Sequence, residues 1–243
     1  MPPQVSLVLS CEHGGMELPP WFPRPASQRF NKLLKSHQSY DKGAFELAKI
    51  LAQVLKCPLL AHTYSRLVID CNRREGHPDL FGKFIVGYPS KTTLPKAIHI
   101  HRAYRTKLSK ALDSCLPPLG PENFTPIHLS IHSFTPIYKG KRRETDVGIL
   151  YDPKRPQEAL LALKFKRAFI QKFPGLRVQF NKPYRGTDEG VAVWARENWG
   201  KGSKRFTALE WEFNQGTVVR WSAKRKKLLA GVFKEVFSAE FGL

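Results

Sequence analysis

The sequence predicts an α/β fold of three layers, in which helices cover both faces of a mixed β-sheet. Short apolar runs alternate along the chain with longer segments of helical periodicity, a pattern typical of this class. The 243 residues suffice for one large domain or two small ones. Because no segment of 20 to 50 residues repeats, we expect a single domain over residues 1–243.

Seven short runs, most of them apolar, predict strands. They are Val5–Ser10, Pro58–Ala61, Arg66–Cys71, Ile127–Ile131, Asp146–Tyr151, Leu176–Phe180 and Thr207–Phe213. In sheets of this class the ligand binds where loops leave the carboxyl ends of the strands. We therefore expect the chemistry of the protein at that edge.

Six segments with apolar residues at helical spacing predict helices. Two begin near Ser27 and Lys42, three span Leu94–Leu112, Pro156–Phe173 and Glu189–Asn198, and the last begins after Ser222. Serine is a favourable N-cap. Leu229, Val232, Phe233 and Val236 then give the last helix one apolar face.

The chain is strongly basic, with 40 lysines and arginines against 20 acidic residues and a net charge of +20. Such a charge attracts phosphate groups and other anions. The positive residues are nevertheless spread along the chain, and their densest runs are Lys139–Arg143, Lys164–Lys172 and Lys224–Lys227. We expect an ordinary solvated basic surface, and nucleic-acid binding stays as an unfavoured alternative.

The cysteines indicate a reducing compartment. Cys11, Cys57, Cys71 and Cys115 show no close pairing of the kind that a disulfide framework or structural zinc site uses. The N-terminal apolar run is too short for a signal peptide or a membrane span. We therefore expect a cytoplasmic protein that does not insert into a membrane.

Polar side chains collect at the ends of the predicted strands. They are Glu12, His13, Asp70, Asn72, Arg73, His132, Glu210 and Glu212. Imidazole and carboxylate are ligands that zinc prefers, and a catalytic zinc keeps three protein ligands and a water. His13 and His132 are the natural pair, although a lone histidine is more often structural, which is our interpretation of His128.

Two glutamates share one face of a predicted strand. Glu210 and Glu212 are two residues apart in an otherwise apolar segment, where a buried carboxylate is costly unless it is paired or bound. One of them would act as general base, then general acid, in a hydrolysis; the alternative is a structural ion pair with an arginine. Arg73 offers a planar fork for a substrate carboxylate, unless it is simply solvated.

Seven segments in order along the chain resemble the N-formylglutamate amidohydrolase family. They are SCEHGGMELP (10–19), SYDKGAFELAKILA (39–52), SRLVIDCNR (65–73), HLSIHSFTP (128–136), GKRRETDVGILYD (140–152), NKPYRG (181–186) and ALEWEFNQG (208–216). More distantly, that family is similar to the zinc exopeptidases and aspartoacylases. The resemblance therefore implies a zinc-exopeptidase-like sheet and a Zn²⁺ cofactor.

The resemblance also implies roles for individual residues. His13 and His132 would bind zinc, Asn72 and Arg73 would hold the substrate carboxylate, and Glu212 would be the base. Arg143 resembles a second anion-binding position, and Arg185 would be another, unless both are simply solvated.

The middle zinc ligand departs from the distant relatives. They carry a glutamate three residues after the first histidine, where this chain has Met16. Asp41 in the SYDKGA segment is our choice, with Glu17 as the alternative.

The first functional hypothesis is a zinc-dependent hydrolase of the amide bond in a small N-acyl amino acid such as N-formylglutamate. A second is a basic module that has kept an amidohydrolase fold but lost its metal site, and that binds nucleic acid or an anionic polymer. A third keeps the zinc hydrolase but changes its substrate to an acylated peptide or a cell-wall fragment. Residue spacing selects neither the acyl group nor the amino acid, and leaves the oligomeric state open.

Overall fold

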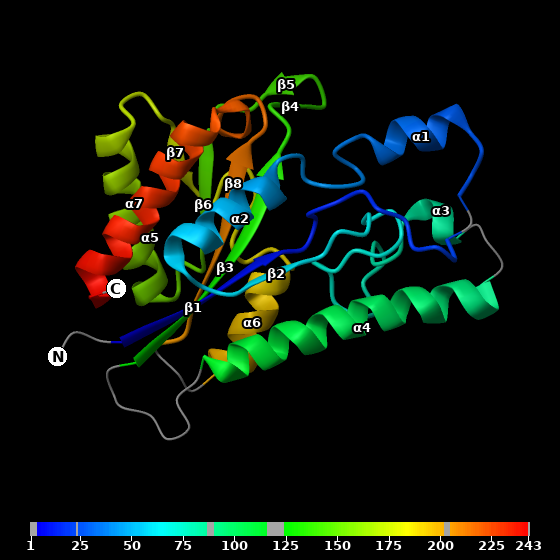
Figure 1. Cartoon of the computed structure of the whole chain (residues 1–243), viewed down its shortest axis with the longest axis horizontal. Coiled ribbons are helices and arrows are strands. Elements are labelled where there is room, and N and C mark those ends of the chain that lie inside the picture. Colours follow the sequence, from blue (N-terminus) through cyan, green and yellow to red (C-terminus); the bar gives the residue numbers. More distant parts are fainter. Residues whose placement is uncertain (1–3, 23, 87–89, 116–123, 202–204, 243) are drawn as a thin grey trace.

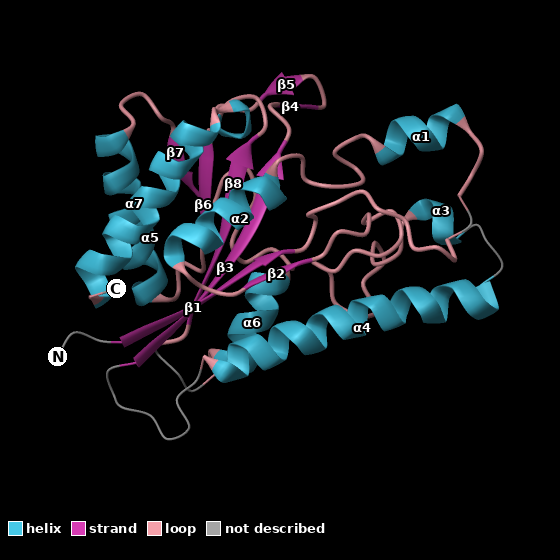
Figure 2. Cartoon of the chain, in the orientation of Figure 1, coloured by secondary structure: helices cyan, strands magenta, loops and turns pink. Residues whose placement is uncertain are grey.

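A six-stranded mixed sheet forms the centre of the molecule (Figures 1 and 2). The computed structural model describes residues 4–22, 24–86, 90–115, 124–201 and 205–242. In sheet order the strands are β2 (Leu59–Ala61), β1 (Gln4–Cys11), β3 (Phe124–Phe134), β8 (Thr207–Asn214), β6 (Val147–Leu150) and β7 (Val178–Phe180). The first four run parallel, whereas β6 is antiparallel to β8 and β7 is parallel to β6. The predicted mixed α/β sheet is thus confirmed.

Helices cover both faces of this sheet. One face packs against α2 (Ala44–Leu55), α5 (Pro156–Lys172) and α7 (Ala223–Phe241), and the other against α4 (Ser90–Ser114) and α6 (Val191–Trp199). Two short helices, α1 (Gln28–Leu34) and α3 (Lys83–Val86), lie beyond the sheet on the side of α4 (Figure 1). The hydroxyls of Ser27 and Ser222 cap α1 and α7, as N-cap serines do.

An aromatic cluster fixes β8 against the first helical layer. Trp211 is fully buried, and its ring lies 4.5 Å from that of Phe233, 4.9 Å from that of Phe165 and 5.7 Å from that of Phe169, between centroids. Because side chains alternate along a strand, burying Trp211 on this face turns Glu210 and Glu212 to the opposite one. Packing of the core therefore orients the candidate catalytic carboxylates.

One predicted strand is absent. Arg66–Cys71 forms turns, with only an isolated bridge between Ile69 and Phe81. Leu67, Val68 and Ile69 are buried in the core on the α4 side of the sheet. Burial of a turn, and not pairing with a neighbouring strand, therefore explains why all three are apolar. An apolar run of this length does not distinguish a buried turn from a buried strand.

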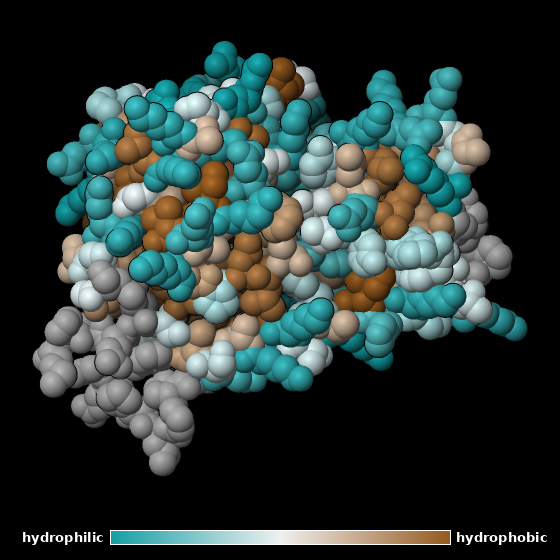
Figure 3. Space-filling model, in the orientation of Figure 1, coloured by the Kyte–Doolittle hydropathy of each residue, from teal (hydrophilic) through white to brown (hydrophobic). Residues whose placement is uncertain are grey.

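The other predicted strands and helices are present within a few residues of their expected bounds. Sequence reasoning did not anticipate α3, the β4–β5 hairpin (Ile137–Tyr138 and Lys141–Arg142) or the 3₁₀ turn η1 (Val218–Arg220). On the face drawn in Figure 3, hydrophilic residues cover much of the surface, and apolar ones show between them both on the side of α2 and α7 and around α1, α3 and α4. Within the described ranges, no helix has the length and apolar character needed to cross a membrane.

Candidate metal centre and substrate pocket

Three side chains from distant parts of the sequence meet at one edge of the sheet. His13 follows β1, Asp41 precedes α2, and His132 lies in β3. One ligand atom from each lies within 4.8 Å of the others, and all three residues are buried. The ring centroids of the two histidines are 5.0 Å apart, close enough for both imidazoles to touch one ion. The structure therefore brings the three predicted ligands together.

The turn after β1 requires small residues. The backbone N–H of Gly14 donates to the carbonyl of His62 (3.0 Å), and that of Asp41 donates to the carbonyl of His13 (2.9 Å). A Cβ atom on Gly15 would lie 2.3 Å from the carbonyl oxygen of Thr63, so only glycine permits this approach of the two segments. The Gly14-Gly15 pair thereby lets the loop that carries His13 pack against the backbone of residues 62 and 63.

The two ring nitrogens of His13 have different surroundings. Nε2 lies 2.7 Å from Oδ1 of Asp70. Nδ1 is buried, has no hydrogen-bond partner among the described residues, and lies 3.5 Å from Oδ2 of Asp41. Burial alone would raise the pKa of Asp70, but the charge of His13 and its hydrogen bond lower it well below the usual range. Asp70 therefore fixes the ring so that Nδ1 points into the cluster.

His132 is held in the same way by a second carboxylate. Its Nδ1 lies 2.9 Å from Oδ2 of Asp41, while Nε2 lies 3.0 Å from Oε2 of Glu12 and 2.9 Å from Oγ of Ser130. Burial would lower the pKa of His132, but the carboxylates of Glu210, Asp41 and Glu12 raise it well above its ordinary value. Metal-binding histidines characteristically donate their second ring N–H to a carboxylate.

Asp41, our choice for the third ligand, faces both imidazoles. Its Oδ2 points to the two histidines, and its Oδ1 accepts from the guanidinium of Arg66. Burial would raise the pKa of Asp41, and the charges of Arg66 and His13 hold it well below the usual range. Asp41 is therefore ionised, as a metal ligand must be.

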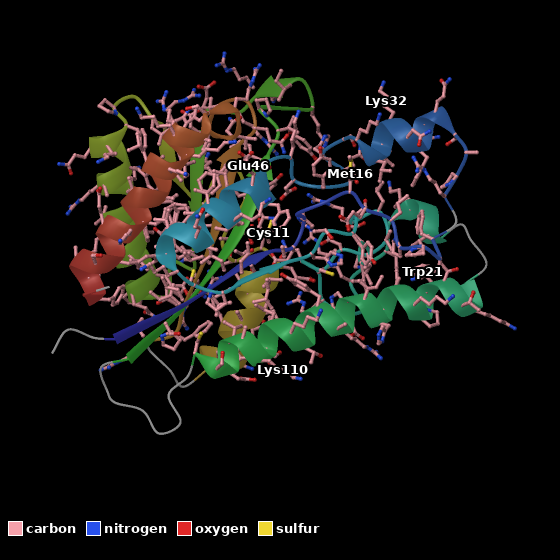
Figure 4. The ribbon with its side chains drawn as sticks, in the orientation of Figure 1. Cys11, Met16, Trp21, Lys32, Glu46 and Lys110 are labelled. Atoms are coloured by element: carbon pink, nitrogen blue, oxygen red, sulfur yellow. The ribbon has the colours of Figure 1, made fainter. Side chains whose placement is uncertain are left out.

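The alternative ligand lies elsewhere. Glu17 accepts a hydrogen bond from Thr63, and its backbone pairs with Tyr64 away from the cluster. Met16, on the loop after β1, is 42% exposed (Figure 4). The structure thus brings Asp41, and not Glu17, to the histidines.

This donor set fits a catalytic zinc site. Two imidazoles and one carboxylate are ligands of the kind and number that such sites use. The orphaned Nδ1 of His13 marks a position where a buried nitrogen lacks a partner. Asp70 and Glu12 supply outer carboxylates to the two rings.

A polar cavity of about 200 Å³ opens over the cluster. Beyond the three predicted ligands, its walls include Arg66, Asn72, Arg73, Tyr184, Arg185, Glu210 and Glu212. Glu212 is 4% exposed, and its Oε2 is buried without a hydrogen-bond partner among the described residues. Within the same ranges neither glutamate forms an ion pair, so the structural ion pair considered above is not found for them.

The two glutamates of β8 lie beside different residues of the neighbouring strand β3. Glu212 is the register partner of His132, and Glu210 is the partner of Ser130. Burial, with nearby carboxylates, raises the pKa of Glu212 well above its ordinary value, and burial also raises that of Glu210. Both therefore hold a proton more tightly than an exposed glutamate.

Asn72 and Arg73 line the cavity from the loop that replaces the predicted strand. Oδ1 of Asn72 accepts from the backbone N–H of Val191 at the start of α6 (2.6 Å). The guanidinium of Arg73 donates to the carbonyl of Glu189 (3.1 Å) and lies 4.0 Å from Asp70. Helix α6 and Asp70 thus position this pair beside the cluster.

Arg143 is not among the residues that line the cavity. Its guanidinium lies 4.7 to 5.4 Å from the ring centroids of Phe134, Tyr138 and Tyr184, and it donates to the Tyr184 hydroxyl (3.3 Å). Arg143 thus contacts Tyr184, which does line the cavity. Arg185, the further candidate, does line the cavity.

Sequence reasoning assigned no role to Arg66 or Tyr184. Arg66 lies inside the SRLVIDCNR segment and Tyr184 inside NKPYRG, two of the seven segments that resemble the family. The position of Arg66, a charged residue directly before the apolar run 67–69, could have indicated a buried ion pair.

Comparison with known proteins identifies the family. The family model described as N-formylglutamate amidohydrolase matches residues 5–219. No functionally curated protein matches the chain significantly.

Solved structures share the fold. A gene product of Agrobacterium tumefaciens has a TM-score of 0.76 at 21% identity, covering 98% of this chain and 90% of its own. An N-formylglutamate amidohydrolase from Ralstonia eutropha JMP134 has a TM-score of 0.66 at 19% identity, covering 96% and 92%. With the family match spanning most of its length, the chain belongs to the N-formylglutamate amidohydrolase family, whose members are hydrolases of amide bonds.

Proposed function

We propose that the protein is a zinc-dependent hydrolase of the amide bond in a small N-acyl amino acid, of which N-formylglutamate is the family's example. The observation that carries this proposal is the position of Glu212. Its unpartnered oxygen shares one small cavity with the His13, Asp41 and His132 cluster. Two imidazoles, one carboxylate and a free glutamate form the set that hydrolysis at a zinc centre needs.

His13, Asp41 and His132 would hold the ion. When bound, zinc would polarise the acyl carbonyl and make a water molecule more acidic. Glu212 accepts a proton from the attacking water and donates it to the departing amine nitrogen. Burial raises the pKa of Glu212, which brings the carboxyl group closer to the working pH of a general acid-base catalyst.

Asn72 and Arg73 would hold the α-carboxylate of the substrate. A guanidinium fork binds a carboxylate in two places and so fixes its orientation. Because α6 and Asp70 hold both residues, the scissile carbonyl is aligned with the cluster before reaction. The volume of about 200 Å³ suits a small molecule.

The decisive experiment combines metal analysis with two matched variants. We expect one zinc per chain and hydrolysis of N-acyl amino acids by the purified protein. Glu212→Gln keeps the zinc and lowers kcat by at least about 100-fold, the range of a lost general base. Glu210→Gln, two residues away on the same face, is the control and retains more activity. If Glu212→Gln kept activity within tenfold, the role of Glu212 would be wrong.

Two wider proposals accompany this function. All four cysteines are free, so we assign the protein to a reducing compartment, the cytoplasm.

The hydrophobic core has two parts, one beneath α2, α5 and α7 and the other beneath α4 and α6. Both parts pack on the same sheet, from opposite faces, which supports one domain over residues 1–243.

A further inference from the structure

We propose that Tyr184 is a further catalytic residue, whose hydroxyl donates a hydrogen bond to the acyl oxygen of the substrate, and that Arg143 positions this hydroxyl. The inference rests on the proposed function and adds to it a donor for the negative charge that develops on that oxygen during hydrolysis.

Tyr184 lies on the segment 181–186 that follows β7, and its side chain lines the catalytic cavity. This segment is anchored on both sides of Tyr184. Oδ1 of Asn181 accepts from the backbone N–H groups of Tyr151 (3.1 Å) and Gly186 (2.8 Å). The side chain of Tyr184 is 41% exposed, so it faces the cavity from a fixed backbone without being part of the core.

An aromatic pocket holds Arg143 beside this tyrosine. The guanidinium lies 4.7 to 5.4 Å from the ring centroids of Phe134, Tyr138 and Tyr184, and a cation is attracted to the face of each ring. The backbone N–H of Arg143 donates to the carbonyl of Pro136 (2.8 Å). Both the backbone and the side chain of Arg143 are therefore held in place.

The hydrogen bond between the two side chains has one possible direction. Nη2 of Arg143 lies 3.3 Å from the hydroxyl oxygen of Tyr184, and because a guanidinium can only donate, the oxygen accepts. The hydroxyl proton then points away from Arg143, which does not line the cavity, and toward the cavity that the ring lines. Among the described residues nothing accepts this proton. The structure thus presents an unused donor to the cavity.

This donor lies on the side of Glu212 and keeps its proton. Gly148, the register partner of Glu212, packs directly against the carbonyl of Lys182 on the same segment as Tyr184. Burial and the carboxylate of Glu212 raise the pKa of Tyr184 above its ordinary value, although Arg143 acts the other way. The hydrogen bond from Arg143 also polarises the hydroxyl, which strengthens it as a donor.

The acyl oxygen is the substrate atom that needs such a donor. Asn72 and Arg73 would hold the α-carboxylate, and Glu212 would move the protons of the water and the amine. Attack on the acyl carbon places negative charge on the acyl oxygen, where one aimed donor is worth about 100- to 1,000-fold in kcat. Arg66 also lines the cavity, but its guanidinium is paired with Asp41.

Tyr184→Phe removes the hydroxyl and nothing else. We expect kcat for N-formylglutamate to fall at least about tenfold. KM should change less than about threefold, because the donor acts mainly on the transition state. Tyr138→Phe is the matched control, since its ring also stacks on Arg143 but does not line the catalytic cavity, and it leaves kcat unchanged. An unchanged kcat in Tyr184→Phe, or a loss carried by KM alone, overturns the inference.

Arg143→Gln tests the positioning role. We expect it to lower kcat in the otherwise wild-type protein, but by less than about twofold in the Tyr184→Phe background, because Arg143 acts through the hydroxyl. A purely structural role would give the same loss in both backgrounds, and that result contradicts the role of Arg143.

A binding measurement separates this inference from the proposed function. N-Methylphosphonylglutamate has a tetrahedral, negatively charged phosphorus group where the substrate has its acyl carbon. In zinc-loaded Glu212→Gln protein, calorimetry should show that adding Tyr184→Phe weakens binding of this analogue at least about tenfold and that of N-formylglutamate less than about threefold. If no N-acyl amino acid is hydrolysed, the hydrolase proposal fails, but this comparison still tests the donor. Equal affinities for the analogue, or no binding of it, contradict the role of Tyr184.

Discussion

Nε2 of His132 lies 3.0 Å from Oε2 of Glu12, a carboxylate with no exposure to solvent. The hydroxyls of Tyr104 and Ser130 donate to the two oxygens of this carboxylate at 2.6 and 2.7 Å. Burial would raise the pKa of Glu12, but the hydrogen bond and charge of His132 lower it well below the usual range. An ionised Glu12 keeps a proton on Nε2 of His132, which leaves Nδ1, 2.9 Å from Oδ2 of Asp41, as the nitrogen that would bind an ion.

The Glu12→Gln variant tests this arrangement. An amide keeps the size of the side chain but no longer favours the proton on Nε2, so we expect zinc affinity to fall about 10- to 100-fold. Competition with a chelator measures the affinity directly. Glu158→Gln is the control, because Glu158 is equally buried but pairs with Arg196 away from the cluster. Equal zinc affinity in Glu12→Gln and wild type would contradict the role of Glu12.

Arg73→Lys tests the carboxylate clamp. Lysine keeps the charge but loses the planar fork, so kcat/KM for N-acyl amino acids should fall about 10- to 100-fold, the worth of a charged hydrogen bond. Steady-state kinetics on an N-acyl amino acid and on its carboxamide check this, since only the former has a carboxylate. The neighbouring Arg74, whose side chain is 75% exposed, provides the control Arg74→Lys. A loss that is the same for the acid and the carboxamide would exclude the clamp.

Stability should fall in mild acid because of His128. It is fully buried beside Oγ of Ser10 (2.8 Å), and burial lowers its pKa to about 4. The unfolded chain, with a histidine pKa of about 6.5, binds the proton first as the pH falls. The contribution of neutral, buried His128 to the free energy of unfolding is therefore complete above pH 6.5. About 3 kcal/mol of that free energy is lost as the pH drops to 4.

Thermal unfolding of His128→Gln between pH 7 and 4 measures this contribution. The variant should show a shallower loss of Tm with acid than the wild type does. His99→Gln, on the exposed side of α4, should match the wild type. Identical acid sensitivity in His128→Gln and wild type would refute the assignment to His128.

Gly148→Ala should damage both stability and the catalytic cavity. Gly148 is the register partner of Glu212, and a Cβ atom on it would lie 2.0 Å from the carbonyl oxygen of Lys182 and 3.2 Å from Cβ of Glu212. The strand or the 181–186 segment that carries Tyr184 must shift, at a cost of about 1 to 3 kcal/mol. Chemical denaturation and kcat/KM measure the two effects.

Gly231→Ala is the control for this substitution. Nothing lies within 4 Å of a Cβ atom added at Gly231 in helix α7, so alanine should stabilise by about 0.5 to 1 kcal/mol. Full activity and unchanged stability in Gly148→Ala would show that the close packing at Gly148 has no consequence.

The local pattern of residues determined most of the sheet and part of the site. Alternation in Thr207–Phe213 predicted a strand, and it placed Glu210 and Glu212 on one face. Because strand and helix periods arise from neighbouring residues, these features were readable without the fold. The motifs around His13 and His132 likewise identified two candidate ligands before any geometry was known.

Tertiary packing decided the rest. Asp41 reaches His13 because its backbone N–H donates to the carbonyl of His13, far away in the sequence, a contact that no local period encodes. The apolar Arg66–Cys71 run is a buried turn because the α4 side of the core takes its side chains. Which distant segments meet depends on how whole surfaces pack, and that information is spread over the entire chain.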